Sequence, residues 1–119
     1  MANFYGAPEI SVQTLKQRLE NQNIPLLLDV REKWELIYAR LPVNKMLFAP
    51  LSQLAHFGLD ALPQETRNKQ KELIVICHHG VRSAEVTAWL IQQGWENVHS
   101  LEGGLDTYAE QIDPSIGRY

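Results

Sequence analysis

Cys77 is the only cysteine in the chain, and it stands where an apolar run ends and a polar loop begins. The run is Leu73–Cys77, and the residues that follow are His78, His79, Gly80, Val81, Arg82 and Ser83. Backbone N–H groups of a tight loop can converge on one anion, and a helix beginning at Ser83 adds the unpaired N–H groups of its first turn. Arg82 adds a permanent positive charge, and cations and helix N-termini both favour the thiolate form of cysteine. We therefore expect Cys77 to be a reactive nucleophile.

The chemistry that suits this setting is the transfer of a sulfur atom. A Cys77 thiolate attacks the outer sulfur of an anionic donor such as thiosulfate and becomes a persulfide, and a second nucleophile such as cyanide or a thiolate then removes that sulfur. Arg82 and the loop N–H groups stabilise the anionic states, while Gly80 permits backbone angles that a side chain forbids. The alternative is that a lone cysteine after an apolar strand is only a small buried hydrophobic residue.

The elements that must position this loop alternate between short apolar runs and amphipathic stretches, which predicts a parallel sheet with helices on both faces. Strands are expected at Leu26–Val30, Met46–Ala49, Leu73–Cys77 and Asn97–Leu101. Helices are expected from the N-cap Ser11 to near Asn21–Asn23, and at Arg31–Tyr38, Leu51–Phe57, Ser83–Gln93 and Leu105–Gln111. Trp34, Trp89 and Trp95 are expected to pack in the core. Ligands of such folds bind at the carboxyl ends of the strands, and that rule points to the loop after Cys77.

The composition limits the class of protein. The 119 residues fit one domain, with an expected core over about residues 8–111 and a tail over residues 112–119. The formal net charge of −3 argues against a nucleic-acid binder that uses a broad basic surface. The apolar runs are too short for a membrane span, and the first residues do not have the pattern of a signal peptide. A single cysteine forms no internal disulfide, so we expect a reducing, cytoplasmic location.

Two further motifs accompany the cysteine loop, and together the three resemble the rhodanese family. Leu28-Asp29-Val30-Arg31-Glu32 precedes Trp34-Glu35, and Leu101-Glu102-Gly103-Gly104 precedes Tyr108. The segment from Cys77 to Ser83 is similar to the family's Cys-x-x-Gly-x-Arg-Ser loop. The resemblance extends from about Ile10 to Tyr108. It implies a three-layer α/β sandwich, with thiosulfate sulfurtransfer or relay of persulfide sulfur as the activity.

The resemblance also implies the roles of single residues and the partners. Cys77 is the expected catalytic residue, the loop His78–Ser83 is expected to bind the persulfide, and the carrier needs no cofactor other than the sulfur itself. Asp29 and Arg31 are expected either to line the site mouth and support the loop or to form a structural ion pair. The expected partners are a small anionic sulfur donor and a cysteine desulfurase or sulfur-carrier protein. We expect no metal, because adjacent histidines such as His78 and His79 rarely direct both rings at one ion.

One segment departs from the family pattern, and two other functions stay open. Ala39–Asn44 stands where the family usually has Gly-His-Ile-Pro-Gly-Ala, so the shape of this turn is not predicted. Cysteine phosphatases with related loops place five residues between cysteine and arginine, whereas this chain has four. The shorter loop favours sulfur over phosphate. A non-enzymatic docking module is the other alternative, although the presence of both Cys77 and Arg82 favours activity.

Overall fold

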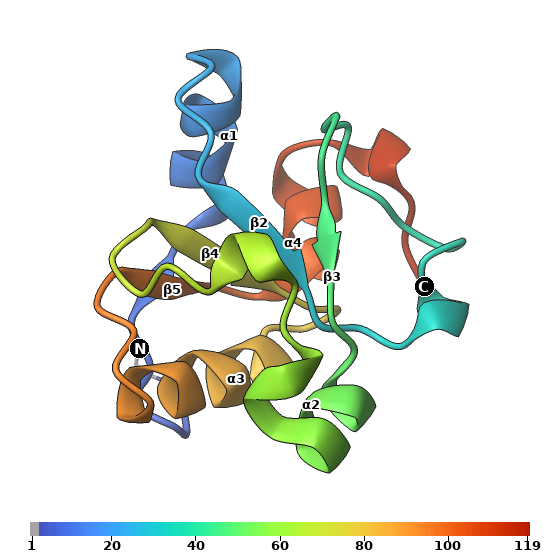
Figure 1. Cartoon of the computed structure of the whole chain (residues 1–119). Helices are drawn as coiled ribbons and strands as arrows, with labels where there is room; N and C mark the ends of the chain where they lie inside the picture. The colour runs from blue at the N-terminus through green and yellow to red at the C-terminus, as the bar shows by residue number, and fades with distance from the viewer. Residues whose placement is uncertain (1–2) are drawn as a thin grey trace.

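The computed structural model describes residues 3–119, and at their centre is a five-stranded parallel sheet (Figure 1). The strands are β1 (Glu9–Ile10), β2 (Leu26–Asp29), β3 (Leu47–Phe48), β4 (Leu73–Ile76) and β5 (Val98–Leu101). Their order across the sheet is β1-β5-β4-β2-β3, so that β4 pairs with both β5 and β2. The strand that leads into Cys77 therefore lies in the middle of the sheet.

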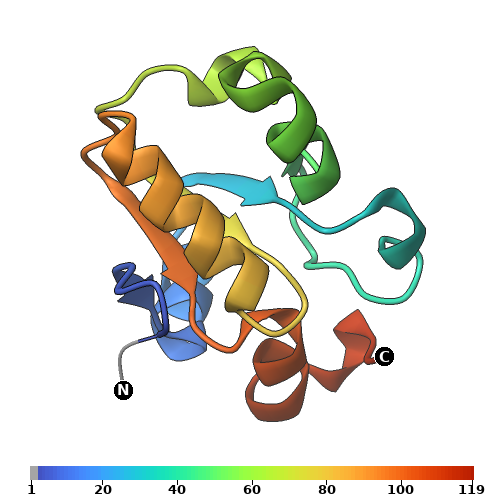
Figure 2. The same ribbon diagram turned by 90° about the horizontal axis from the view of Figure 1, so that it is seen from below.

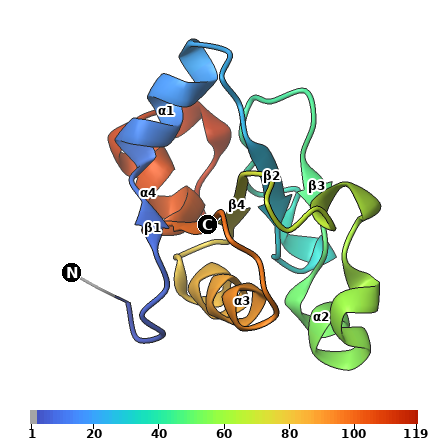
Figure 3. The same ribbon diagram turned by 60° about the vertical axis from the view of Figure 1, so that its left-hand side comes forward.

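Helices cover both faces of this sheet, which confirms the predicted three-layer α/β architecture. The helices are α1 (Val12–Glu20), α2 (Leu51–Phe57), α3 (Val81–Gln92) and α4 (Gly104–Gln111). The pair α1 and α4 lies on one face, and the pair α2 and α3 lies on the other (Figures 1 and 3). Short 3₁₀ turns at Lys33–Glu35, Gly58–Ala61, Gln64–Thr66 and Pro114–Ile116 complete the elements.

The residues of β4 explain why this strand is apolar throughout. Successive side chains of a strand point to opposite faces, and here each face is covered by a helix layer. Ile74 and Ile76 pack in the cluster formed with α1 and α4, whereas Leu73 and Val75 pack in the cluster formed with α2 and α3. All four side chains are at most 1% exposed. Cys77 continues the second set and lies at the edge of the α2–α3 cluster.

The ends of two helices agree with the sequence, and the start of a third does not. Ser11 caps α1, because its Oγ accepts a hydrogen bond from the Thr14 N–H at 3.1 Å. Gly58 ends α2 with φ 62°, as predicted. The prediction that α3 starts at Ser83 is wrong: Gly80, with φ 89°, is the N-cap and the helix begins at Val81. Arg82 and Ser83 therefore belong to the first turn of the helix.

The segment Arg31–Tyr38 was expected to be a helix, and only a single 3₁₀ turn forms there. Two hydrogen bonds close the turn Lys33–Glu35: the Glu35 carboxylate accepts from the Glu32 N–H at 2.8 Å, and the Glu35 N–H donates to the Glu32 carbonyl at 3.0 Å. Trp34 is 65% exposed, so its predicted place in the core is also wrong. Trp95 is buried as predicted and donates its indole N–H to the Thr66 carbonyl at 2.8 Å.

The loop between β4 and α3 lies next to the C-terminal segment, as the view from below shows (Figure 2).

Strand β1 was not predicted, since its two residues are too few to show a period. No helix within residues 3–119 has both the length and the apolar content needed to cross a membrane.

Candidate active site

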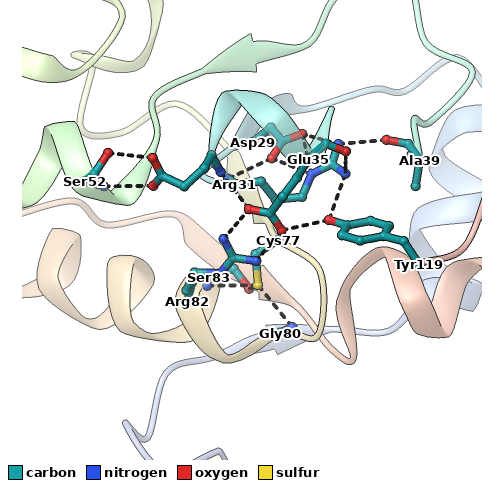
Figure 4. A network of polar contacts seen from close by, with 11 residues as sticks. Asp29, Arg31, Glu35, Ala39, Ser52, Cys77, Gly80, Arg82, Ser83 and Tyr119 are labelled. Carbon is teal, nitrogen blue, oxygen red and sulfur yellow. Dashed lines mark hydrogen bonds and ion pairs between the residues drawn. The ribbon is translucent and has the colours of Figure 1, made fainter. Parts of the chain in front are cut away.

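The sulfur of Cys77 lies under the first turn of α3 and is 1% exposed with the rest of its residue (Figure 4). Its Sγ accepts hydrogen bonds from the N–H groups of Gly80 at 3.1 Å and Ser83 at 3.3 Å. Because the N-cap Gly80 has no side chain, the sulfur takes the place of a capping oxygen. An acceptor at a helix N-terminus is stabilised when it is negatively charged, so the position favours a sulfur anion.

Two buried hydroxyls extend the polar surroundings of this sulfur into the sheet. Ser83 Oγ is 3.3 Å from Cys77 Sγ and 2.7 Å from Ser100 Oγ in β5. Both serines are fully buried. Ser83 was predicted to belong to the site, whereas Ser100 was not, because a serine within a strand gives no signal in a single sequence.

The N-terminus of α4 holds the backbone of the loop from behind. Leu105 N–H donates to the Cys77 carbonyl and Asp106 N–H donates to the His78 carbonyl, both at 2.9 Å. A Cβ atom on Gly104 would lie 2.5 Å from each of these two carbonyl oxygens. A Cβ atom on Gly80 would lie 2.8 Å from the N atom of Gly103. Gly104 and Gly80 are therefore needed for the close approach of α4 to the loop.

Arg82 is fixed at the side of the sulfur by a two-pronged ion pair with Glu35. The guanidinium Nη1 and Nη2 lie 2.6 and 2.8 Å from the two carboxylate oxygens. Glu35 is 2% exposed and also accepts hydrogen bonds from the Glu32 N–H and the Tyr119 hydroxyl. The bond from Arg82 is the main cause that lowers the pKa of Glu35 to about 2, and the same pair raises the pKa of Arg82. Three N–H groups of Arg82 do not take part in this pair, namely the Nε–H and one N–H on each terminal nitrogen.

Asp29 and Arg31 form a buried ion pair beneath the turn that carries Glu35. Arg31 is 1% exposed, and its Nη2 is 2.8 Å from Asp29 Oδ2. The Nε–H also donates to the Asp29 carboxylate, and the other terminal N–H groups donate to the carbonyls of Glu35 and Ala39 and to the Tyr119 hydroxyl. Of the two roles expected for these residues from the sequence, the structure shows the structural ion pair, which lies below the site.

The altered segment Ala39–Asn44 connects this ion pair to β3. Ala39 and Leu41 are buried in the α1–α4 cluster, so the segment packs well without the family's usual residues. A pocket of about 310 Å³ opens beside it, lined by Asp29, Arg31, Leu36, Arg40, Leu41, Val43, Asn44, Met46, Phe48 and Leu105. Cys77 does not line this pocket.

The two histidines of the loop stack on one another and on Tyr119. The rings of His78 and His79 are 3.8 Å apart, and the rings of His78 and Tyr119 are 3.7 Å apart and nearly parallel at 12°. Burial, and then repulsion from His79, lowers the pKa of His78.

Val81 is 62% exposed and does not contact the sulfur through a hydrogen bond. Within residues 3–119 no group of three or more metal-binding side chains comes together.

Three residues of this site were not predicted as functional, namely Glu35, Ser100 and Tyr119. Glu35 had a signal, since the Trp34-Glu35 motif was recognised, but its partner Arg82 is 47 positions away and nothing in a single sequence pairs them. Tyr119 lies in a segment without periodicity, and its contacts depend on the folding of the chain.

The fold and the loop define a class of protein, and the sequence profile of the Rhodanese-like domain matches residues 11–111. The chain belongs to the rhodanese-like family.

Individual relatives agree with this assignment. A putative sulfurtransferase of Bacillus subtilis, YtwF, is 32% identical over 108 residues, which cover 89% of this chain and 94% of the relative. The Rhodanese-like/PpiC domain-containing protein 12 of Arabidopsis thaliana is 33% identical over 114 residues, which cover 93% of this chain but only 37% of that relative. A rhodanese-related protein of Thermoplasma volcanium superposes with a TM-score of 0.69 at 28% identity, over 88% of this chain and 93% of the other.

Proposed function

We propose that this protein is a sulfurtransferase that carries sulfane sulfur as a persulfide on Cys77. The observation that carries the proposal is the convergence of the Gly80 and Ser83 N–H groups on a buried cysteine sulfur, with Arg82 fixed beside it. The Bacillus subtilis relative, of which the aligned region covers 94%, is named a putative sulfurtransferase. This similarity supports the proposal.

The transfer takes place in two displacements. The Cys77 thiolate attacks the outer sulfur of thiosulfate, the S–S bond of the donor breaks, and sulfite leaves with the electron pair. A nucleophile such as cyanide or a thiolate then attacks the outer sulfur of the persulfide and restores the Cys77 thiolate. The Ser83 hydroxyl, backed by Ser100, donates to the sulfur anion, and the loop N–H groups stabilise the charge in both steps.

The expected donor is a small anion. The N–H groups of Arg82 outside its pair with Glu35 suit the oxygens of a sulfonate end, because guanidinium binds such groups through charge-assisted hydrogen bonds. The depth of Cys77 favours a donor whose reacting sulfur atom protrudes, as the outer sulfur of thiosulfate does. The covalently held sulfur takes the place of a cofactor, so no further group is required.

Steady-state turnover tests this proposal. Wild-type protein with thiosulfate and cyanide is expected to form thiocyanate, and Cys77→Ser is expected to lose at least about 10³-fold because its hydroxyl does not accept sulfane sulfur. An aryl phosphate should not be hydrolysed, since the loop of four residues is too short for a phosphate. Hydrolysis of the aryl phosphate without thiocyanate formation would replace sulfur transfer by phosphatase chemistry.

An exposed apolar surface beside the loop favours a protein as the natural donor or acceptor. Trp34, Ile37 and Tyr38 are 65%, 78% and 49% exposed, and the Tyr38 ring is 5.5 Å from that of Tyr119. Exposed aromatic residues that cluster are typical of protein interfaces. We propose that a cysteine desulfurase or a sulfur-carrier protein binds here.

The double variant Trp34→Ala/Ile37→Ala separates this docking role from the chemistry. Turnover of thiosulfate should be unchanged, while sulfur transfer from a desulfurase-bound persulfide should fall on the order of tenfold, because such anchors carry much of an interface's affinity. The control is Phe57→Ala, an exposed aromatic residue at the end of α2. Equal rates for all three proteins with the persulfide donor would remove the docking role.

A further inference from the structure

Tyr119 links the two arginines of the site through one hydroxyl group (Figure 4). The hydroxyl donates to Glu35 Oε1 at 2.9 Å and accepts from Arg31 Nη1 at 3.1 Å. Arg31 is in turn held by Asp29, and Glu35 holds Arg82. A continuous chain of polar contacts therefore runs from the buried ion pair below the sheet edge to the cation beside the sulfur.

The ring of Tyr119 is held as firmly as its hydroxyl. The centroid of this ring lies 3.7 Å from that of the His78 ring and 5.5 Å from that of the Tyr38 ring. The segment that carries it is also anchored: Ile116 is buried, its carbonyl accepts from the Arg40 N–H at 2.9 Å, and Arg118 pairs with Asp106 and Glu110. Tyr119 is thus positioned by the fold and contacts the catalytic loop directly.

The carboxylate of Glu35 receives four hydrogen bonds, two from Arg82, one from the Glu32 N–H and one from Tyr119. The Tyr119 bond falls on Oε1, the same oxygen that accepts from Arg82 Nη2. An oxygen that is fixed by a second donor holds its arginine in a narrower range of orientations. The hydroxyl therefore limits where the remaining N–H groups of Arg82 point.

Resting on the proposed function, we propose that Tyr119 is a positioning residue for sulfur transfer. It holds Glu35, and through Glu35 it keeps Arg82 oriented toward the anionic end of the sulfur donor. It does not touch the transferred sulfur. Its effect therefore belongs to the binding of the donor and depends on the presence of the two-pronged arginine.

Kinetics of Tyr119→Phe test this role, because phenylalanine keeps the ring on His78 and removes only the hydroxyl. The KM for thiosulfate is expected to rise about three- to tenfold with kcat changed less than about twofold, because the lost hydrogen bond acts on the donor only through the arginine that it positions. Tyr5→Phe is the matched control, an exposed tyrosine that packs on Phe4 outside the site, and it should behave as wild type. In an Arg82→Lys background, which lacks the two-pronged pair, Tyr119→Phe should have less than about a twofold effect.

A second readout does not depend on sulfur chemistry. The hydrogen-exchange rate of the Arg82 Nη–H groups that pair with Glu35, followed by NMR in the protein without donor, should rise several-fold in Tyr119→Phe and stay unchanged in Tyr5→Phe. Wild-type kinetics together with an unchanged exchange rate in Tyr119→Phe would overturn the inference, and so would an equal loss in the Arg82→Lys background. If wild-type protein itself does not use thiosulfate, the proposed donor fails and the exchange rate alone decides the role of Tyr119.

Discussion

Glu35 connects the electrostatics of the site to the stability of the fold. It is almost fully buried, and its charge is balanced by Arg82 and supported by the hydrogen bonds from Glu32 and Tyr119. A buried carboxylate with such partners stabilises the folded state only while it is ionised. The Glu35–Arg82 pair is therefore both the support of the anion site and a pH-sensitive contribution to folding.

The free energy of unfolding should depend on pH through this residue. The folded-state pKa of Glu35 is about 2 and its ordinary value is 4.5, so the contribution is fully present above pH 4.5 and is lost as the pH falls toward 2. The shift corresponds to about 3 kcal/mol. Denaturant titrations between neutral and acid pH should show that Glu35→Gln lacks this loss, while Glu85→Gln, on the exposed side of α3, keeps it. Parallel curves for wild type and Glu35→Gln would contradict the account.

At the residue scale, the sequence predicted the centre of the site better than its support. Cys77 and Arg82 were predicted from the types and spacing of residues within one loop. Such a prediction depends only on neighbouring residues and does not require the fold to be known. Glu35, Ser100 and Tyr119 act through contacts with residues far away in the sequence, and one sequence carries no record of such pairs.

At the scale of elements, α4 is as important for the loop as α3. The N-terminus of α3 supplies the two N–H groups that point at the sulfur, and the N-terminus of α4 supplies those that hold the loop carbonyls. Two helix N-termini therefore meet at Cys77. The N–H groups of α3 stabilise an anion on the sulfur, whereas those of α4 fix the backbone that carries it.

The contact between α4 and the loop predicts the effect of Gly104→Ala. A Cβ atom would lie 2.5 Å from the carbonyl oxygens of Cys77 and His78, on a backbone with φ 65°. Left-handed strain and overpacking should together cost about 2–5 kcal/mol and reduce sulfur uptake by displacing the loop. Gly6→Ala is the matched control, because its φ is 67° and nothing lies within 4 Å of the added Cβ.

Thermal and denaturant unfolding of the two variants, together with their sulfur uptake, check this prediction. The Gly6 variant should lose only the strain contribution of about 1–2 kcal/mol and keep wild-type uptake. Equal stability losses and equal uptake in the two variants would show that α4 does not hold the loop.

Most elements were predicted from periodicity, and the exceptions have physical causes. The start of α3 was placed at Ser83 because serine is a common N-cap, whereas Gly80 reaches the required angles and the sulfur replaces the capping oxygen. The expected helix Arg31–Tyr38 is limited to one turn because Arg31 is drawn into the ion pair with Asp29. Tertiary contacts decided both cases against local preference.

At the scale of the whole molecule, the topology brings distant parts of the chain to one end of the sheet. The ends of β2, β4 and β5 lie side by side in a parallel sheet, so Asp29, Cys77 and the Gly103-Gly104 turn meet at the same edge. This edge is where ligands of parallel α/β folds bind. The architecture and the edge were predicted from the alternation of strands and helices, whereas the C-terminal segment that completes the site was not.

The intact mass of the protein tests the central claim most directly. Purified wild-type protein would be measured before and after incubation with thiosulfate, and again after cyanide, with Cys77→Ser treated in parallel. The account predicts that wild type gains the mass of one sulfur atom, loses it with cyanide, and that Cys77→Ser does neither. A wild-type mass that stays constant with thiosulfate and with a desulfurase-derived persulfide, while the fold is intact, would contradict the assignment of Cys77 as a sulfur carrier.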